Sequence, residues 1–84
     1  MPILAVFSGI TIRMYFQQSE HNPPHVHAQY GGEVAEIAIR TGDVLDGRLP
    51  PKELEMVREW IYVNRAALLS MWETQQFRKL PPLT

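Results

Sequence analysis

The distribution of glycine and proline along this chain constrains its fold most. All five glycines lie within the first 47 residues, and neither glycine nor proline occurs between residues 52 and 80. Because both residues interrupt helices, the C-terminal stretch is able to form one long helix, while the N-terminal part should consist of short elements joined by turns. The sequence therefore predicts a single α+β domain over residues 1–84, with strands within about 3–48, a helix over about 51–79 and an extended tail at 80–84.

The first β-hairpin is predicted from two β-rich runs, 3–7 and 10–16, which are separated by Ser8-Gly9. A two-residue connection of this kind between such runs is a hairpin signal. Side chains alternate along a strand, so the second run has one apolar and one mixed face. The apolar face, assigned to the core, comprises Ile10, Ile12, Met14 and Phe16, and the other face comprises Thr11, Arg13 and Tyr15.

A second hairpin is predicted over residues 25–40, with Gly31-Gly32 as its two-residue turn. Such a turn fixes the register, which a three-residue turn would change. The expected pairs are His27 with Glu36, His25 with Ala38, and Val26 with Ile37. The apolar face then holds Val26, Ala28, Tyr30, Ala35, Ile37 and Ile39, and the polar face holds His25, His27, Gln29 and Glu36.

The remaining chain is expected to turn at 41–43, extend briefly over Val44-Leu45, turn at Asp46-Gly47 and enter a helix at Pro50-Pro51. Apolar residues then recur at helical spacing, interrupted by Asn64. This pattern fits one long helix or two with a bend near Asn64-Arg65. The stripe consists of Leu54, Val57, Ile61, Leu68, Met71 and Trp72. We expect it to cover the apolar face of a small antiparallel sheet of two hairpins, leaving the histidines facing solvent or a partner.

Composition excludes several functions. The net charge is −1 and no third of the chain is basic, which argues against tight non-specific binding of nucleic acid but allows a nuclease with a few local contacts. The absence of cysteine excludes disulfides, thiolate metal sites and a cysteine nucleophile. With no signal-peptide pattern and no long apolar run, we expect a bacterial cytoplasmic protein without membrane association. So small a core favours a homodimer or a partner protein.

All three histidines lie within residues 21–27, in the segment His21-Asn22-Pro23-Pro24-His25-Val26-His27. On a strand, His25 and His27 point the same way, about 6.5–7 Å apart. Together with His21 they form a candidate metal site, to which Glu36 would add a carboxylate. Three histidines with no thiolate and no assured carboxylate make an incomplete site. We therefore expect weak metal binding at best and assign no cofactor.

The same segment also suits acid–base catalysis, because histidine titrates near neutral pH. Metal-independent RNA cleavage needs a base for the 2′-hydroxyl, an acid for the leaving oxygen and a cation for the phosphate. The candidate catalytic residues are His25, His27, Glu36, Arg13 and Tyr15, with Arg48 as a second residue for the phosphate. The third interpretation is that the histidines are structural or belong to an interface.

The chain resembles the bacterial family called domain of unknown function 4160. The resemblance is carried by the His-Asn-Pro-Pro-His-x-His core, the residues around it at 12–16 and Tyr30-Gly31, the segments 41–45 and 47–50, and Trp60 and Trp72. Its motif positions here are Arg13, Tyr15, His21, His25, His27 and Tyr30. Residues 17–20 (Gln-Gln-Ser-Glu) depart from the more acidic stretch that is common in the family.

The resemblance implies a biological role. Members are often encoded beside a protein of the domain of unknown function 2442 family, in pairs that resemble type II toxin–antitoxin modules. We therefore expect a toxin, with the neighbouring protein as its antitoxin and RNA as the substrate of the histidine face. His21, Tyr30 and Arg48 are expected to bind that substrate. The alternative is a non-catalytic module that binds a protein or a metal.

Overall fold

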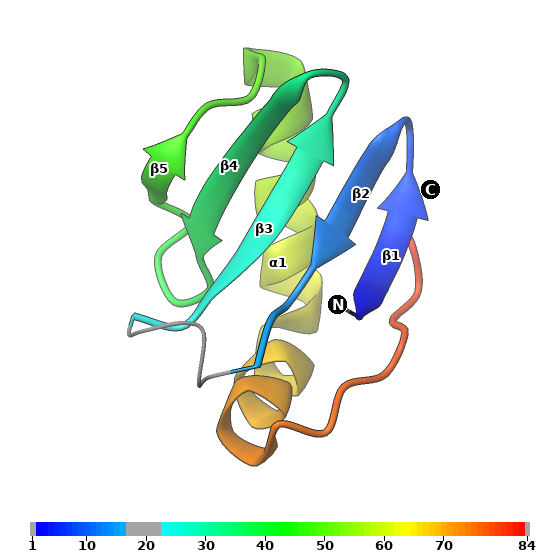
Figure 1. Cartoon of the computed structure of the whole chain (residues 1–84), viewed down its shortest axis with the longest axis vertical. Coiled ribbons are helices and arrows are strands. Elements are labelled where there is room, and N and C mark those ends of the chain that lie inside the picture. The colour runs from blue at the N-terminus through cyan, green and yellow to red at the C-terminus, as the bar shows by residue number, and fades with distance from the viewer. Residues whose placement is uncertain (1, 17–22, 84) are drawn as a thin grey trace.

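The computed structural model describes residues 2–16 and 23–83. Within these residues the chain forms β1 (Ile3–Phe7), β2 (Ile10–Arg13), β3 (His25–Tyr30), β4 (Glu33–Ala38), β5 (Val44–Gly47) and α1 (Pro51–Thr74). The strands form one antiparallel sheet in sequence order, with α1 behind it (Figure 1). The predicted α+β architecture is confirmed. The two hairpins share one sheet, and β5 forms where a short extended piece and a turn were expected.

The predicted register of the second hairpin is confirmed. His27 pairs with Glu36, and the flanking pairs are also those expected from a two-residue Gly31-Gly32 turn. The Ser8-Gly9 turn connects β1 and β2 with a positive φ at both residues, the backbone shape that matches the twist of a hairpin. The pairing of β2 with β3 further places Arg13 directly opposite His27.

β2 is shorter than expected, because it ends at Arg13 rather than at residue 16. Continuing the β2–β3 register would set Phe16 opposite Pro24, which has no N–H to donate to a neighbouring strand. The assignment of Phe16 to the core was therefore wrong. Its side chain is 46% exposed and its ring contacts that of Phe77, with the centroids 5.0 Å apart.

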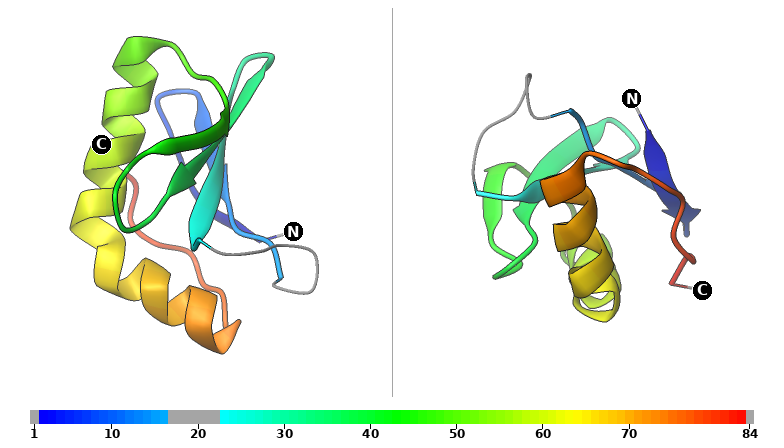
Figure 2. Two further views of the ribbon diagram at one scale, coloured as in Figure 1. Left: turned by 90° about the vertical axis from the view of Figure 1, so that its left-hand side faces the viewer. Right: turned by 90° about the horizontal axis from the view of Figure 1, so that it is seen from below.

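The core lies between α1 and one face of the sheet (Figure 2). The sheet contributes residues such as Ile12, Val26 and Ile37, and the helix contributes Val57, Trp60, Ile61, Leu68, Met71 and Trp72. Of the two arrangements expected for the helical region, the continuous helix is observed. Figure 2 shows that it bends along its length, so that its C-terminal half turns toward the start of β3.

The helix ends at Thr74, five residues before the expected end at 79. Gln75 adopts a left-handed conformation with φ 62°, and its backbone N–H donates to the carbonyl of Met71. The following tail runs beside β1 (Figure 1), where the N–H of Leu80 donates to the carbonyl of Leu4 at 2.8 Å. The indole N–H of Trp60 donates to the carbonyl of Pro81, which ties the tail to α1.

Across the described residues, no helix combines the length and the apolar character needed to cross a membrane.

Candidate functional site

The sheet face that α1 does not cover, here called the open face, carries a row of polar side chains. Cross-strand pairing sets Arg13 of β2 beside His27 of β3, His27 beside Glu36 of β4, and Glu36 beside Asp46 of β5. These four residues are called the polar row. Because each member is the direct neighbour of the next, the row brings cationic, imidazole and carboxylate groups together across four strands.

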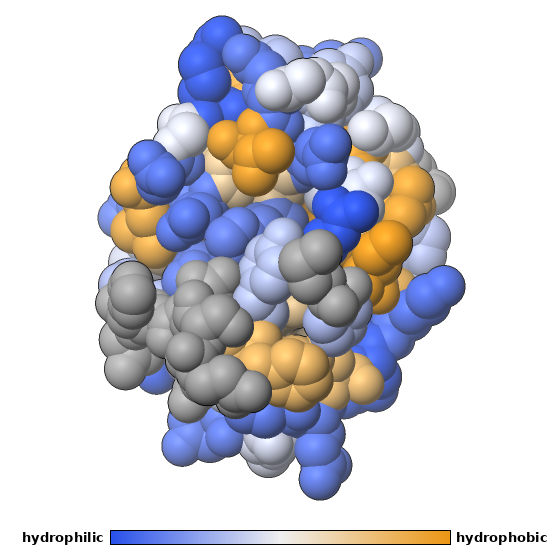
Figure 3. Space-filling view, viewed as in Figure 1, coloured by the Kyte–Doolittle hydropathy of each residue, from blue (hydrophilic) through white to orange (hydrophobic). Residues whose placement is uncertain are grey.

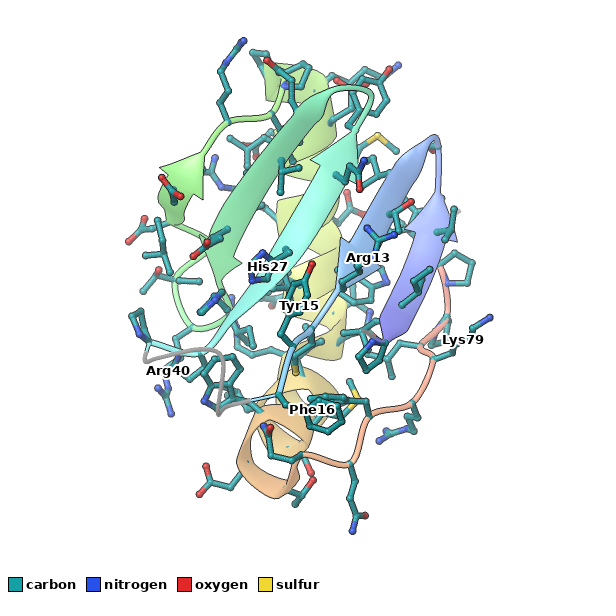
Figure 4. The ribbon with its side chains drawn as sticks, viewed as in Figure 1. Arg13, Tyr15, Phe16, His27, Arg40 and Lys79 are labelled. Carbon is teal, nitrogen blue, oxygen red and sulfur yellow. The ribbon has the colours of Figure 1, made fainter. Side chains whose placement is uncertain are left out.

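Tyr15 packs against the middle of this row. Its ring meets that of His27 edge to face, with centroids 4.3 Å apart and an interplanar angle of 76°. Figure 4 shows Tyr15 reaching between His27 and Arg13 on the open face. An edge-to-face contact of this kind favours one orientation of an imidazole. Tyr15 therefore helps to orient His27 although it lies beyond the end of β2.

His25 is buried, with only 4% of its surface exposed. Its ring lies between the rings of His27 and Trp72, at centroid distances of 5.2 Å and 5.1 Å. We expected both histidines to face solvent. That expectation is wrong for His25, because the bend of α1 brings Trp72 against the start of β3. His27 is half-buried.

The orientation of the His25 ring is fixed by the backbone that precedes it. Nδ1 of His25 lies 2.8 Å from the carbonyl oxygen of Pro23, and since a carbonyl only accepts, Nδ1 must carry the proton and donate. The other nitrogen, Nε2, then lies 3.6 Å from Oε1 of Glu36, whose side chain is 32% exposed.

His25, His27 and Glu36 form a compact group, here called the His–Glu cluster. One nitrogen of each imidazole and one carboxylate oxygen all lie within 4.8 Å of one another. Two members of the expected histidine metal set are therefore present together with the carboxylate. The third, His21, lies outside the described residues.

Two predicted substrate-binding residues lie elsewhere. Tyr30 is at the far end of β3, three positions from His27 and on the helix-facing side, where its ring approaches Gly9. Arg48 follows β5, and its guanidinium donates to Glu33 at 2.7 Å near the β3–β4 turn. Neither is brought to the His–Glu cluster. The cluster, Arg13 and Tyr15 therefore make up the candidate site.

A comparison with known families covers all the described residues of the candidate site. Residues 9–73, which include every member of the polar row, both described histidines and Trp72, match the family model described as Domain of unknown function (DUF4160). The chain belongs to this family. Neither the curated proteins nor the solved structures include one that matches the chain.

Two residues that adjoin the candidate site of this DUF4160 protein were not connected with it from the sequence. Asp46 was expected in a turn, because Asp-Gly is a common turn pair, yet it lies in β5 opposite Glu36. Trp72 was assigned to packing and does pack in the core, but its ring also contacts His25. No local signal in the sequence indicates this contact between the helix and the histidine segment.

A pocket of about 320 Å³ also occurs in this DUF4160 protein, between α1 and the tail. It is lined mainly by uncharged residues, among them Trp60, Val63 and Pro81, and Glu59 supplies the one ionisable group among the described residues around it. Such a lining offers no pair of groups for proton transfer. The open face is therefore the better candidate for chemistry.

Proposed function

We propose that this DUF4160 protein is the toxin of a bacterial type II toxin–antitoxin pair and that its open face cleaves RNA. The observation that carries the proposal is the placement of Arg13, Tyr15 and His27 side by side on the open face. They supply a cation, a hydroxyl and an imidazole, the three kinds of group that metal-independent cleavage of RNA requires.

The proposed reaction uses each group once. The 2′-oxygen of one ribose attacks the adjacent phosphorus while its proton passes to His27. The bond from phosphorus to the 5′-oxygen breaks, and that oxygen takes a proton from the hydroxyl of Tyr15. The guanidinium of Arg13 stabilises the negative charge of the phosphate. One of its nitrogens donates to Gln29 at 2.9 Å, and a guanidinium has further N–H groups for a phosphate. The products are a 2′,3′-cyclic phosphate and a 5′-hydroxyl.

In this scheme His25 and Glu36 position His27 rather than touch RNA. His25 is too buried to reach a substrate, and its ring packs against that of His27. Glu36 is the cross-strand neighbour of His27 and carries the charge closest to it on β4. The net charge of −1 is consistent with few contacts to phosphate groups, of which Arg13 would make the main one.

The open face also suits the proposed antitoxin, a protein of the domain of unknown function 2442 family. Val6 and Val34 lie on this face and are 58% and 47% exposed. Figure 3 shows apolar patches on either side of a hydrophilic centre. Apolar residues that flank a polar site are typical of protein interfaces. They also favour the second candidate function, a non-catalytic module that binds a protein through this face.

The test is induced expression in a bacterial host of wild type, His27→Ala and Asp46→Asn. Asp46→Asn is the matched control, because it changes a charged member of the polar row outside the His–Glu cluster. We expect wild type and Asp46→Asn to slow growth and His27→Ala to lose the effect. Co-expression of the neighbouring gene should restore growth.

Two results would contradict the proposal. If soluble wild-type protein leaves growth unchanged in several hosts, the toxin role fails. If folded His27→Ala slows growth as strongly as wild type, the chemistry assigned to His27 fails and the binding module becomes the better explanation.

A further inference from the structure

His25 has the orientation that is usual for a metal-binding histidine. In most protein metal sites, one imidazole nitrogen binds the metal and the other donates to a carbonyl or carboxylate, which fixes the ring. Here Nδ1 donates to the carbonyl of Pro23, so Nε2 is the nitrogen presented to Glu36. The packing of the ring against Trp72 adds to this constraint.

The separation of the two atoms fits a shared metal better than a hydrogen bond. At 3.6 Å, Nε2 of His25 and Oε1 of Glu36 are too far apart for a hydrogen bond. Nitrogen and oxygen ligands of a tetrahedral zinc ion, each about 2.0–2.2 Å from the metal, lie about 3.3–3.4 Å from one another. The pair therefore needs to close by only a few tenths of an ångström around a metal.

His27 completes a three-ligand set. All three ligand atoms lie within 4.8 Å of one another, so the widest separation must shrink by about 1.4 Å to reach the spacing of tetrahedral ligands. Rotation of the half-buried side chains of His27 and Glu36 is able to provide this movement. Two imidazoles and a carboxylate bind zinc at sites that keep a fourth position open, and they are poor ligands for magnesium or calcium.

We infer that the His–Glu cluster binds one divalent transition-metal ion of the zinc type through Nε2 of His25, a ring nitrogen of His27 and the carboxylate of Glu36. Weak metal binding was expected from the sequence because no carboxylate was assured. The structure supplies that carboxylate in Glu36. Metal binding by these residues does not depend on the toxin role or on any activity toward RNA.

Metal binding at the His–Glu cluster has one consequence that rests on the proposed function. An imidazole nitrogen that is bound to a metal cannot accept a proton, so zinc competes with the proposed role of His27. Zinc should therefore inhibit RNA cleavage, and a chelator should restore it. The metal would act as a regulator of the site.

The test uses tag-free, chelator-treated full-length protein titrated with zinc in a calorimeter, and with Co²⁺ followed by visible absorption. We expect one metal ion per chain and the visible spectrum of tetrahedral Co²⁺. Glu36→Gln and His27→Ala each alter a proposed ligand and should weaken zinc binding at least about tenfold. Loss of a residue that only hydrogen-bonds to a metal ligand already weakens binding by about this factor. Asp46→Asn, which removes a neighbouring charge outside the cluster, should bind almost as wild type does.

Failure of folded wild-type protein to bind zinc would overturn the inference. So would equal weakening by Glu36→Gln and Asp46→Asn, because the attraction would then come from general negative charge. Zinc binding by a protein that cleaves no RNA would uphold the metal site and contradict the proposed function. Zinc binding that activates cleavage would uphold the site and contradict the metal-free proton transfer.

Discussion

The ring of His25 lies against the indole of Trp72, with the two centroids 5.1 Å apart and their planes at 53°. This contact joins the C-terminal half of α1 to the first residue of β3. A helix residue therefore sets the position of a histidine that in turn packs against His27. The position of His27 on the open face therefore depends on a core residue of α1, although the polar row lies on the opposite side of the sheet from the helix.

The role of Trp72 can be separated from general packing by comparing Trp72→Leu with Trp60→Leu. Both tryptophans are buried on α1, so each change should lower the free energy of unfolding by about 1–4 kcal/mol. Only Trp72→Leu removes an aromatic ring that contacts His25. We therefore expect the imidazole NMR signals of His25 and His27 to move in Trp72→Leu and to stay near their wild-type positions in Trp60→Leu. Unchanged His25 signals in Trp72→Leu would show that the contact does not position the ring.

The two faces of β3 and β4 should respond in opposite ways to substitution. His27→Ala removes a half-buried side chain and its edge contact with Tyr15, which should cost about 1 kcal/mol or less and abolish function. Ile37→Asp should unfold the domain, because it buries an unpaired carboxylate in the core. Thermal melts beside a growth assay compare the two. If His27→Ala melts as early as Ile37→Asp, the histidine is structural and the site is wrongly assigned.

Gly47 is expected to be essential for β5. It has a φ of 74°, and a side-chain carbon there would overlap the carbonyl oxygen of Val34 in the adjacent strand. Gly47→Ala should therefore lower the free energy of unfolding by about 1–3 kcal/mol or more and loosen the strand that carries Asp46. Gly32→Ala is the control, because a side-chain carbon at Gly32 meets nothing within 4 Å; its effect should stay within about 0.5 kcal/mol. Chemical denaturation measures both, and equal stability of the two variants would contradict this account.

The parts of the fold that depend on local geometry could be predicted from the sequence. A two-residue turn at Gly31-Gly32 determines which residues of the two strands pair, so the position of Glu36 beside His27 could be predicted from the turn. The pairing of β2 with β3 did not follow, because the sequence between the two runs carries no two-residue turn signal that would fix a register. The place of Arg13 directly opposite His27 therefore could not be predicted.

Features that depend on distant packing could not be predicted. The buried ring of His25 contacts Trp72, which is far away in sequence and lies on the part of α1 that turns toward the start of β3. The helix was expected to continue past Thr74 because no glycine or proline occurs between Thr74 and Pro81. Gln75 nevertheless adopts the left-handed conformation that glycine usually adopts at the end of a helix, and the tail then turns back to β1.

The most direct test of the account is the cleavage of a single-stranded RNA by purified, chelator-treated wild type, His27→Ala and Asp46→Asn, with folding of each confirmed by thermal melts. Loss of a positioned acid or base typically slows a reaction by about 10²–10⁴-fold. The account predicts that wild type and Asp46→Asn cleave the RNA to fragments with 2′,3′-cyclic phosphate ends, and that His27→Ala is slower by at least about 100-fold. Intact RNA after incubation with folded wild-type protein, or cleavage by His27→Ala at the wild-type rate, would contradict it.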